Sequence, residues 1–238
     1  LIAGAAAAQT LLNISTQLLW FLGVYLLVTA LTPKLMQIHE RFGWRAIGLA
    51  IALTAAIDAL RMNNLFVVTG LLNFLIVWSM AAILGMRYLD FPANPAVGLF
   101  RFIGALAAET LLVAFLPYPL SLVGMPGDSF SNMAPPSLIL ALHCLVLFSL
   151  IEMFRNQLHA LSQRTRVWWF AVQVNMAAMT IYLWHIPMIV LITLVTHLIG
   201  FDRPIDIDNG DLIPAAGFWL PALVFWVLAA VAIISIVQ

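Results

Sequence analysis

Seven long runs of apolar residues constrain the fold of this chain more than any other feature. A helix needs about 20 apolar residues to cross a bilayer, because backbone groups in hydrocarbon must satisfy their hydrogen bonds internally. The runs cover residues 14–31, 44–60, 65–86, 98–116, 136–154, 179–199 and 213–237. Only 8% of the 238 residues are charged, too few for the surface of a water-soluble domain. We therefore expect a single all-α domain, a polytopic transmembrane helix bundle with about seven complete spans.

The connections between these runs divide the basic residues unequally. If successive loops alternate between the two sides of a membrane, one side receives only Arg61 and Arg203. The other side receives the remaining eight basic residues, which are Lys34, Arg41, Arg45, Arg87, Arg101, Arg155, Arg164 and Arg166. Cytoplasmic loops carry an excess of Lys and Arg, so we expect the side with eight, and with it the C-terminus, to be cytoplasmic.

Several segments outside the straight spans have their own predicted character. Pro187 interrupts the sixth apolar region, which predicts an interfacial or kinked helix from about Val167 that leads into the span. Residues 117–136 are rich in Pro, Gly and Ser and predict an ordered series of turns, and residues 202–211 predict an acidic, solvated turn. Residues 1–8 are typical of the end of a membrane segment, so we expect the domain to be incomplete at its N-terminus.

Ionisable side chains inside membrane spans are costly, and each is therefore a candidate site residue. Asp58 and Arg61 share one helix face because they are three residues apart, and Asn63 and Asn64 follow them. One interpretation is a self-neutralising pair at the membrane interface. The other is a pair that lines a cavity for an acceptor substrate.

A second candidate is Glu109, near the middle of the fourth span and without an oppositely charged neighbour on its helix. It must face protein or water, in either a functional polar network or a structural hydrogen bond. Asn73, at a similar depth in the third span, is its natural type of partner, although Asn in spans is more often a packing residue. His143, beside Cys144 in a Leu-rich run, is interpreted as a packing residue.

His185 precedes Ile186 and Pro187, where a loosened helical turn can present an imidazole to a cavity, although a packed core histidine is the commoner case.

A single cysteine excludes an internal disulfide and a Cys-based zinc site, and we expect no bound metal. The zero net charge makes nucleic acid a poor partner. No GxSxG, HExxH, P-loop or GxGxxG motif is present.

Three stretches of the chain resemble the acyltransferase 3 family of polytopic membrane O-acyltransferases. Leu18-Leu19-Trp20-Phe21-Leu22 followed by Leu31-Thr32-Pro33 is similar to the family's mid-chain helix, and Thr180-Ile181-Tyr182-Leu183-Trp184-His185-Ile186-Pro187 is similar to a late helix. Between them, residues 115–119 and 131–136 resemble versions common in actinobacteria. The chain corresponds to the C-terminal two-thirds of such a protein.

The resemblance implies a bacterial plasma-membrane enzyme that moves an acyl group from cytoplasmic acyl-CoA, a co-substrate, to a hydroxyl of a cell-envelope glycan or glycolipid. The family's catalytic Arg and His pair is expected upstream of Leu1, so no catalytic residue is assigned to this chain. His185 and Tyr182 match the late motif and are expected to line the cavity, with no bound cofactor.

Two alternatives remain open at this point. A non-catalytic subunit or permease for a lipid or glycolipid would need a continuous polar path from Asp58 and Arg61 past Glu109 to the inner face. A degenerate family member would act as a scaffold in an envelope-biogenesis membrane complex.

Overall fold

The computed structural model of the chain describes residues 19–63, 67–90, 94–122, 130–178, 182, 205–208 and 211–214. The chain divides into two compact units. One unit comprises residues 22–161, and the other comprises residues 1–21 together with residues 162–238.

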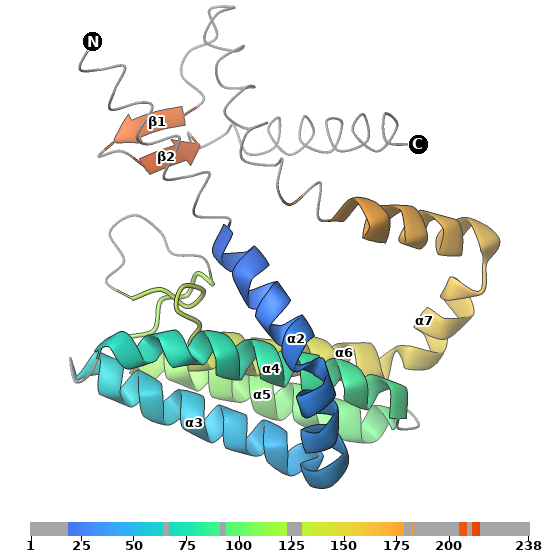
Figure 1. Ribbon diagram of the computed structural model, residues 1–238, viewed down its shortest axis with the longest axis horizontal. Helices are drawn as coiled ribbons and strands as arrows, with labels where there is room; N and C mark the ends of the chain where they lie inside the picture. The colour runs from blue at the N-terminus through green and yellow to red at the C-terminus, as the bar shows by residue number, and fades with distance from the viewer. Residues whose placement is uncertain are drawn as a thin grey trace, which may run out of the picture. The chain divides into compact units, whose positions relative to one another are not determined.

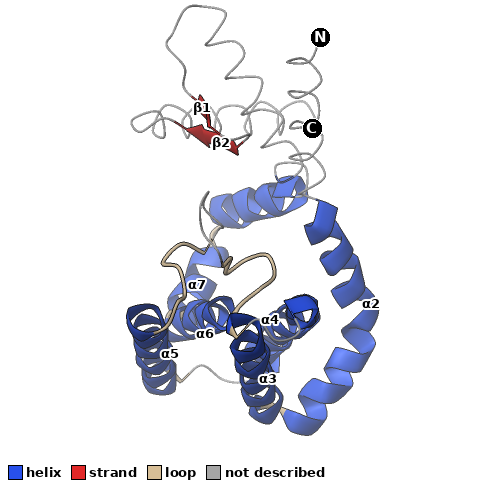
Figure 2. Ribbon diagram, turned by 90° about the vertical axis from the view of Figure 1, so that its left-hand side faces the viewer, coloured by secondary structure: helices blue, strands red, loops and turns tan. Residues whose placement is uncertain are grey.

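The unit of residues 22–161 is a bundle of α-helices (Figure 1). Its elements are α2 (Leu19–Phe42, which begins in the other unit), α3 (Trp44–Met62), the 3-10 helix η1 (Val67–Leu71), α4 (Leu72–Asp90), α5 (Pro95–Phe115), α6 (Leu138–Met153) and α7 (Arg155–Ser162). Helix α6 packs against α3, α4 and α5, and these four helices run side by side (Figures 1 and 2). Because α6 is surrounded, all of its first five residues are buried.

Local sequence signals explain where two of these helices begin. The Asn94 side chain caps α5 by accepting a hydrogen bond from the Val97 amide, and Pro95 occupies the first helical position, where its missing N–H costs nothing. Gly43 joins α2 to α3 at φ +51°, a left-handed conformation that favours glycine. A Cβ atom at Gly43 would also lie 2.8 Å from the Arg87 guanidinium.

The apolar core lies where α4 meets its neighbours. Val77, Met80 and Leu84 follow the three- and four-residue spacing of one helix face and are almost fully buried. They pack with Leu35 of α2, Ile47 of α3 and further residues of α6. These buried residues of α4 define the face of the helix that points into the bundle.

Helices α5 and α6 approach closely at Gly98. A Cβ atom there would lie 3.0 Å from the Met153 side chain and 3.3 Å from the Ser149 carbonyl oxygen. We expect Gly98→Ala to lower the free energy of unfolding by about 1–3 kcal/mol, because the helices must move apart or repack. Thermal melting in detergent would measure this effect.

Gly104 of the same helix provides the matched control, since nothing lies within 4 Å of a Cβ atom at that position. Alanine is the better helix former by about 1 kcal/mol, so Gly104→Ala should leave the melting temperature unchanged or raise it. Equal melting temperatures for the two variants would contradict close packing at Gly98.

The prediction of seven complete spans is not supported by the described residues. Among them, three helices are long and apolar enough to cross a membrane, Trp20–Phe42, Thr69–Tyr88 and Pro95–Phe115. A fourth span is present if α6 and α7, which are bent by 68° at their junction, count as one broken span. Helix α3 matches the predicted run 44–60 in position, but Arg45, Asp58 and Arg61 exclude it from this group.

Two predicted span boundaries were also wrong. The first span was expected to end at Leu31, but α2 continues to Phe42. Leu35 and His39 are buried on one side of this extension, whereas Lys34 and Glu40 on the other are exposed. The part of α2 after Leu31 is therefore an amphipathic helix, although its charged residues suggested a loop. The third span was expected to begin at Leu65, but the chain forms a 3-10 helix before α4 starts at Leu72.

The unit with the C-terminal residues contains a helical segment over residues 165–178, in agreement with the helix predicted from about Val167. Trp168, Trp169 and Phe170 are exposed on it. The predicted span 179–199 lies outside the described residues except for Tyr182, which is helical.

This unit also contains the strands β1 (Ile205–Asp208) and β2 (Asp211–Pro214), which the all-α prediction missed. They pair antiparallel with Asp208 opposite Asp211, so a two-residue connection joins them, as expected for an Asn-Gly turn. Ile213 lies in β2, and the last predicted span therefore does not begin there. The rest of that span lies outside the described residues.

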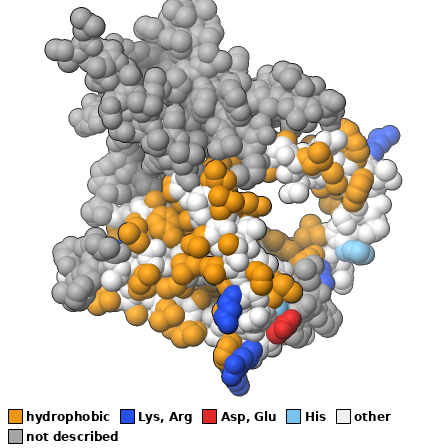
Figure 3. Space-filling model, viewed as in Figure 1, with side chains coloured by type: hydrophobic (Ala, Val, Ile, Leu, Met, Phe, Trp, Pro, Cys, Tyr) orange, Lys and Arg blue, Asp and Glu red, His pale blue; other side chains and the backbone are white. Residues whose placement is uncertain are grey.

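The surface of the described residues is strongly apolar. Figure 3 shows hydrophobic side chains over much of the described area, with Lys and Arg confined to small areas. Phe100 and Phe115 of α5 are both 79% exposed. Such surface is unstable in water and suits contact with lipid, which supports an integral membrane protein.

Candidate functional site

The structure centres one polar cluster on Asp58, whose side chain is only 1% exposed. Its Oδ1 atom accepts hydrogen bonds from Arg61 Nη1 at 2.9 Å and Asn73 Nδ2 at 3.0 Å. Its Oδ2 atom accepts from the Tyr118 hydroxyl at 3.0 Å and the Leu138 amide at 2.7 Å. We call Asp58, Arg61, Asn73, Tyr118 and the Leu138 amide the Asp58 cluster. It joins α3, α4, the segment after α5 and the start of α6.

Residues 117–122 and 130–137 are fixed to this cluster by further hydrogen bonds. The buried Asn132 side chain donates to the carbonyl oxygens of Pro119 and Ser121 at 2.7 and 2.9 Å. The Ser137 hydroxyl donates to Asn132 Oδ1 at 2.7 Å, and Asn73 Nδ2 donates to the Pro136 carbonyl at 2.9 Å. The predicted series of ordered turns is present in these residues.

Arg61 is enclosed by three neighbours as well as paired with Asp58. Its guanidinium carbon lies 4.3 Å from the centroid of the Phe130 ring, a cation–π geometry. A Cβ atom at Gly70 would lie 2.8 Å from Arg61 Cδ and 3.2 Å from Pro135 Cγ, so glycine leaves the space that the Arg61 stem fills. The arginine is therefore held in one orientation.

Tyr118 donates to the cluster as a neutral phenol. Burial raises the pKa of the Tyr118 hydroxyl far above its ordinary value of 10.0, and the neighbouring Asp58 carboxylate raises it further. Both effects oppose a second negative charge beside Asp58. The hydroxyl therefore keeps its proton, and with it the hydrogen bond to Asp58.

A second polar pair joins α5 to α6. His143 Nδ1 lies 3.1 Å from Glu109 Oε1, with the histidine side chain 34% exposed and the glutamate 12%. The expectation that Asn73 would be the partner of Glu109 was wrong, because Asn73 is committed to Asp58 and Pro136. The interpretation of His143 as a simple packing residue was also incomplete.

A third cluster lies where α3 begins, α4 ends, α5 begins and α6 ends. The Trp44 ring has the guanidinium carbons of Arg87 and Arg101 at 4.9 and 3.9 Å from its centroid, and Arg101 is paired with Glu152. We call Trp44, Arg87, Arg101 and Glu152 the basic cluster. Its two arginines bring two guanidinium groups close to one aromatic ring.

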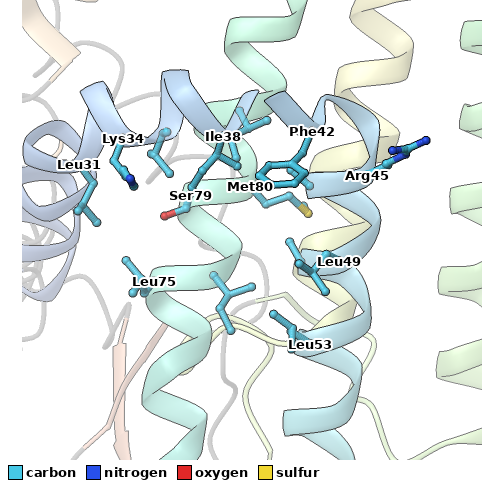
Figure 4. A pocket seen from close by; sticks show the side chains of 15 residues that line it. Leu31, Lys34, Ile38, Phe42, Arg45, Leu49, Leu53, Leu75, Ser79 and Met80 are labelled. Atoms are coloured by element: carbon cyan, nitrogen blue, oxygen red, sulfur yellow. The ribbon is translucent and has the colours of Figure 1, made fainter. Parts of the chain in front are cut away.

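An open apolar groove of about 640 Å³ lies between α2, α3 and α4 (Figure 4). Its lining consists mainly of apolar side chains, with Lys34, Arg45 and Ser79 as the polar members. None of the predicted site residues Asp58, Arg61, Asn73 and Glu109 lines it.

The other predicted site residues lie in the unit with the C-terminal residues or outside the described ranges. The ring of Tyr182 packs on that of Phe21 with centroids 4.6 Å apart. These two residues belong to the mid-chain and late stretches on which the family resemblance rests, so the structure brings one residue of each stretch into contact. His185 and Asn64 lie outside the described residues. The cavity-lining role expected for the predicted site residues stays a prediction.

Sequence reasoning missed Tyr118, Asn132, Trp44 and the pairing of His143. The signal for Asn132 was available, since it lies in a Pro- and Ser-rich stretch where an Asn side chain commonly bonds the backbone. Among the residues that the structure describes, no group of three or more His, Cys, Asp or Glu is arranged to hold a metal ion.

Comparison with protein-family models matches residues 4–237 to the one described as an acyltransferase domain. No curated protein and no solved structure matches the chain.

Proposed function

Since the chain belongs to the acyltransferase 3 family, as the match over residues 4–237 shows, we propose that it moves an acyl group from acyl-CoA to a hydroxyl of a cell-envelope glycan or glycolipid. That match is the observation that carries the proposal. The apolar helices support a membrane location, and in the proposed reaction the acyl donor and a lipid-linked acceptor meet there from opposite sides. We propose that the membrane is the plasma membrane, with the basic cluster on its cytoplasmic side.

The reaction needs two proton transfers. The acceptor hydroxyl must lose its proton as its oxygen attacks the thioester carbon, and the CoA sulfur must gain one as the carbon–sulfur bond breaks. An acid–base group near the acceptor is therefore one requirement of the proposed chemistry.

The Glu109–His143 pair has the composition of such a group. Glu109 bonded to Nδ1 fixes the orientation and tautomer of the ring, which leaves Nε2 to accept a proton from the acceptor hydroxyl. His143 is the sixth residue of α6, and Glu109 is the seventh from the end of α5. At 1.5 Å per residue, both lie about 8–9 Å from the helix ends near the Asp58 cluster, on the predicted extracytoplasmic side.

The basic cluster supports the donor half of the proposal. CoA carries a pyrophosphate and a third phosphate, and arginine forks bind phosphate oxygens well. Both arginine carbons are measured to the same Trp44 ring centroid, so they lie at most 8.8 Å apart. We propose that two guanidinium groups this close together attract an anionic donor.

The alternative of a permease is less well supported. It requires an open polar path that starts at Asp58 and Arg61, but both oxygen atoms of Asp58 are occupied and its side chain is enclosed. A saturated, buried carboxylate offers no hydrogen-bonding capacity to a passing ligand. We therefore propose catalysis rather than transport.

Transfer of radiolabel from acetyl-CoA to a membrane glycolipid extract tests the proposed function. The purified full-length protein should place label in the lipid phase through an ester that mild alkali releases, and a heat-denatured sample should not. Label that appears only as free acetate would mean hydrolysis without transfer. The absence of labelled glycolipid with several short acyl donors would refute the proposed function.

A further inference from the structure

The groove between α2, α3 and α4 has the charge distribution of a site for an amphiphile. Helix α2 passes across one end of the groove, and Lys34 and Arg45 lie at that end (Figure 4). The apolar walls continue away from them along α3 through Leu49 to Leu53, and along α4 to Leu75. No acidic residue is among those that line the groove.

The walls are long enough to hold a substantial part of a hydrocarbon chain. Arg45 and Leu53 are eight residues apart on α3, and Leu75 and Ile83 are eight residues apart on α4. Eight residues of α-helix correspond to about 12 Å. The volume of about 640 Å³ lies within the range of small-molecule sites, and each buried CH₂ group contributes about 0.8 kcal/mol.

The two basic residues are available to a headgroup. Lys34 and Arg45 are both exposed, and within the described part of the chain neither is paired with a carboxylate. Lys34 makes a 3.4 Å contact with Gln37 on its own helix. In Figure 4, Lys34 reaches toward the groove, whereas the Arg45 guanidinium points outward from its rim. The two side chains therefore lie on opposite sides of this end of the groove, with Lys34 toward its interior and Arg45 at its outer rim.

We propose that this groove binds one acyl chain of an anionic glycerophospholipid, with the lipid phosphate bound by Lys34 and with Arg45 adding positive charge at the same end of the groove. Leu49, Leu53 and Leu75 are exposed at the sides of the groove, which therefore opens laterally toward the acyl chains of a surrounding bilayer. The residues that line it include no histidine or carboxylate able to act as a base. These two features favour a resident membrane lipid over a reacting substrate, and the proposal does not depend on acyl transfer.

Native mass spectrometry of the delipidated full-length protein would test this site with phosphatidylglycerol and with phosphatidylcholine of identical chains. We expect one tightly bound phosphatidylglycerol, with a Kd at least tenfold below that of phosphatidylcholine. The double variant Lys34→Gln with Arg45→Gln should lose this preference, since each basic residue near an anionic headgroup contributes about 1 kcal/mol. Ser79→Phe should weaken the binding of both lipids, because it fills the wall of the groove.

Two controls keep the result interpretable. Arg164→Gln with Arg166→Gln removes the same charge from exposed positions outside the groove and should retain the preference. Melting temperatures within error of the parent would show that each variant is folded. Equal affinity for the two lipids, or tight binding that persists in Ser79→Phe, would overturn the proposal. Displacement of the lipid by palmitoyl-CoA, dependent on Lys34 and Arg45, would overturn it in favour of a donor site.

Discussion

Asp58→Ala should lower the free energy of unfolding by about 3–5 kcal/mol, the range measured when one partner of a buried ion pair is removed. The substitution leaves Arg61 as an uncompensated, largely buried charge. It also leaves the Tyr118 hydroxyl and the Leu138 amide without their acceptor. Thermal and denaturant unfolding in detergent micelles would measure the loss.

Glu40→Ala is the matched control for this experiment, because Glu40 is an exposed carboxylate on α2. It should change stability by no more than about 0.5 kcal/mol. Tyr118→Phe removes a single donor from Asp58 and should cost about 1 kcal/mol. If Asp58→Ala melted at the temperature of the parent protein, the Asp58 cluster would not hold the helices together.

His143→Gln should reduce kcat for acyl transfer by 10²- to 10⁴-fold, the usual contribution of a general base. Glutamine has a similar reach but cannot accept a proton at neutral pH. Glu109→Gln should reduce kcat less, because it weakens the orientation of the ring and leaves the imidazole in place. The measurement is the initial rate at saturating acyl-CoA and acceptor.

Cys144→Ala, at the position next to His143, should keep the activity within about twofold and serves as the control for changes in α6 packing. A purely structural role for the pair would lower the melting temperature of His143→Gln and Glu109→Gln without a selective loss of kcat. An active parent with a fully active, stable His143→Gln would reject the assignment of the base and leave the proposed acyl transfer intact.

The positions of α3, α4 and α5 could be predicted from the sequence. A run of apolar residues in lipid must satisfy its backbone hydrogen bonds within the segment, and a helix does so. The end of α2 could not, since Lys34, Glu40 and Arg41 resemble the composition of a loop. A helix at the edge of a membrane needs only one apolar face, and Leu35 and Ile38 provide it. The charged residues of α2 therefore indicate where contact with lipid ends. They do not indicate where the helix ends.

The partners of the buried polar groups were harder to predict. Sequence spacing gives Asp58 and Arg61, because both lie on one helix face. It does not give Glu109 with His143 or Asn73 with Asp58, which depend on how two helices are rotated and shifted against each other. Similar depth of two polar residues in a bilayer therefore does not predict that they are in contact. The β1–β2 hairpin was missed because residues 202–211 were assigned to a solvated turn and the apolar run from Ile213 to a helix.

The hydrogen-bond donors to Asp58 are synthesised in the order of their positions along the chain. Arg61 emerges three residues later, Asn73 follows with α4, and Tyr118 and Leu138 come 60 and 80 residues after Asp58. During synthesis, the carboxylate is therefore neutralised first by its own helix and reaches its full set of donors only when α6 begins. The adjacent arginine accompanies Asp58 into the bilayer, and the completed set of bonds then locks the loop segments against the earlier helices.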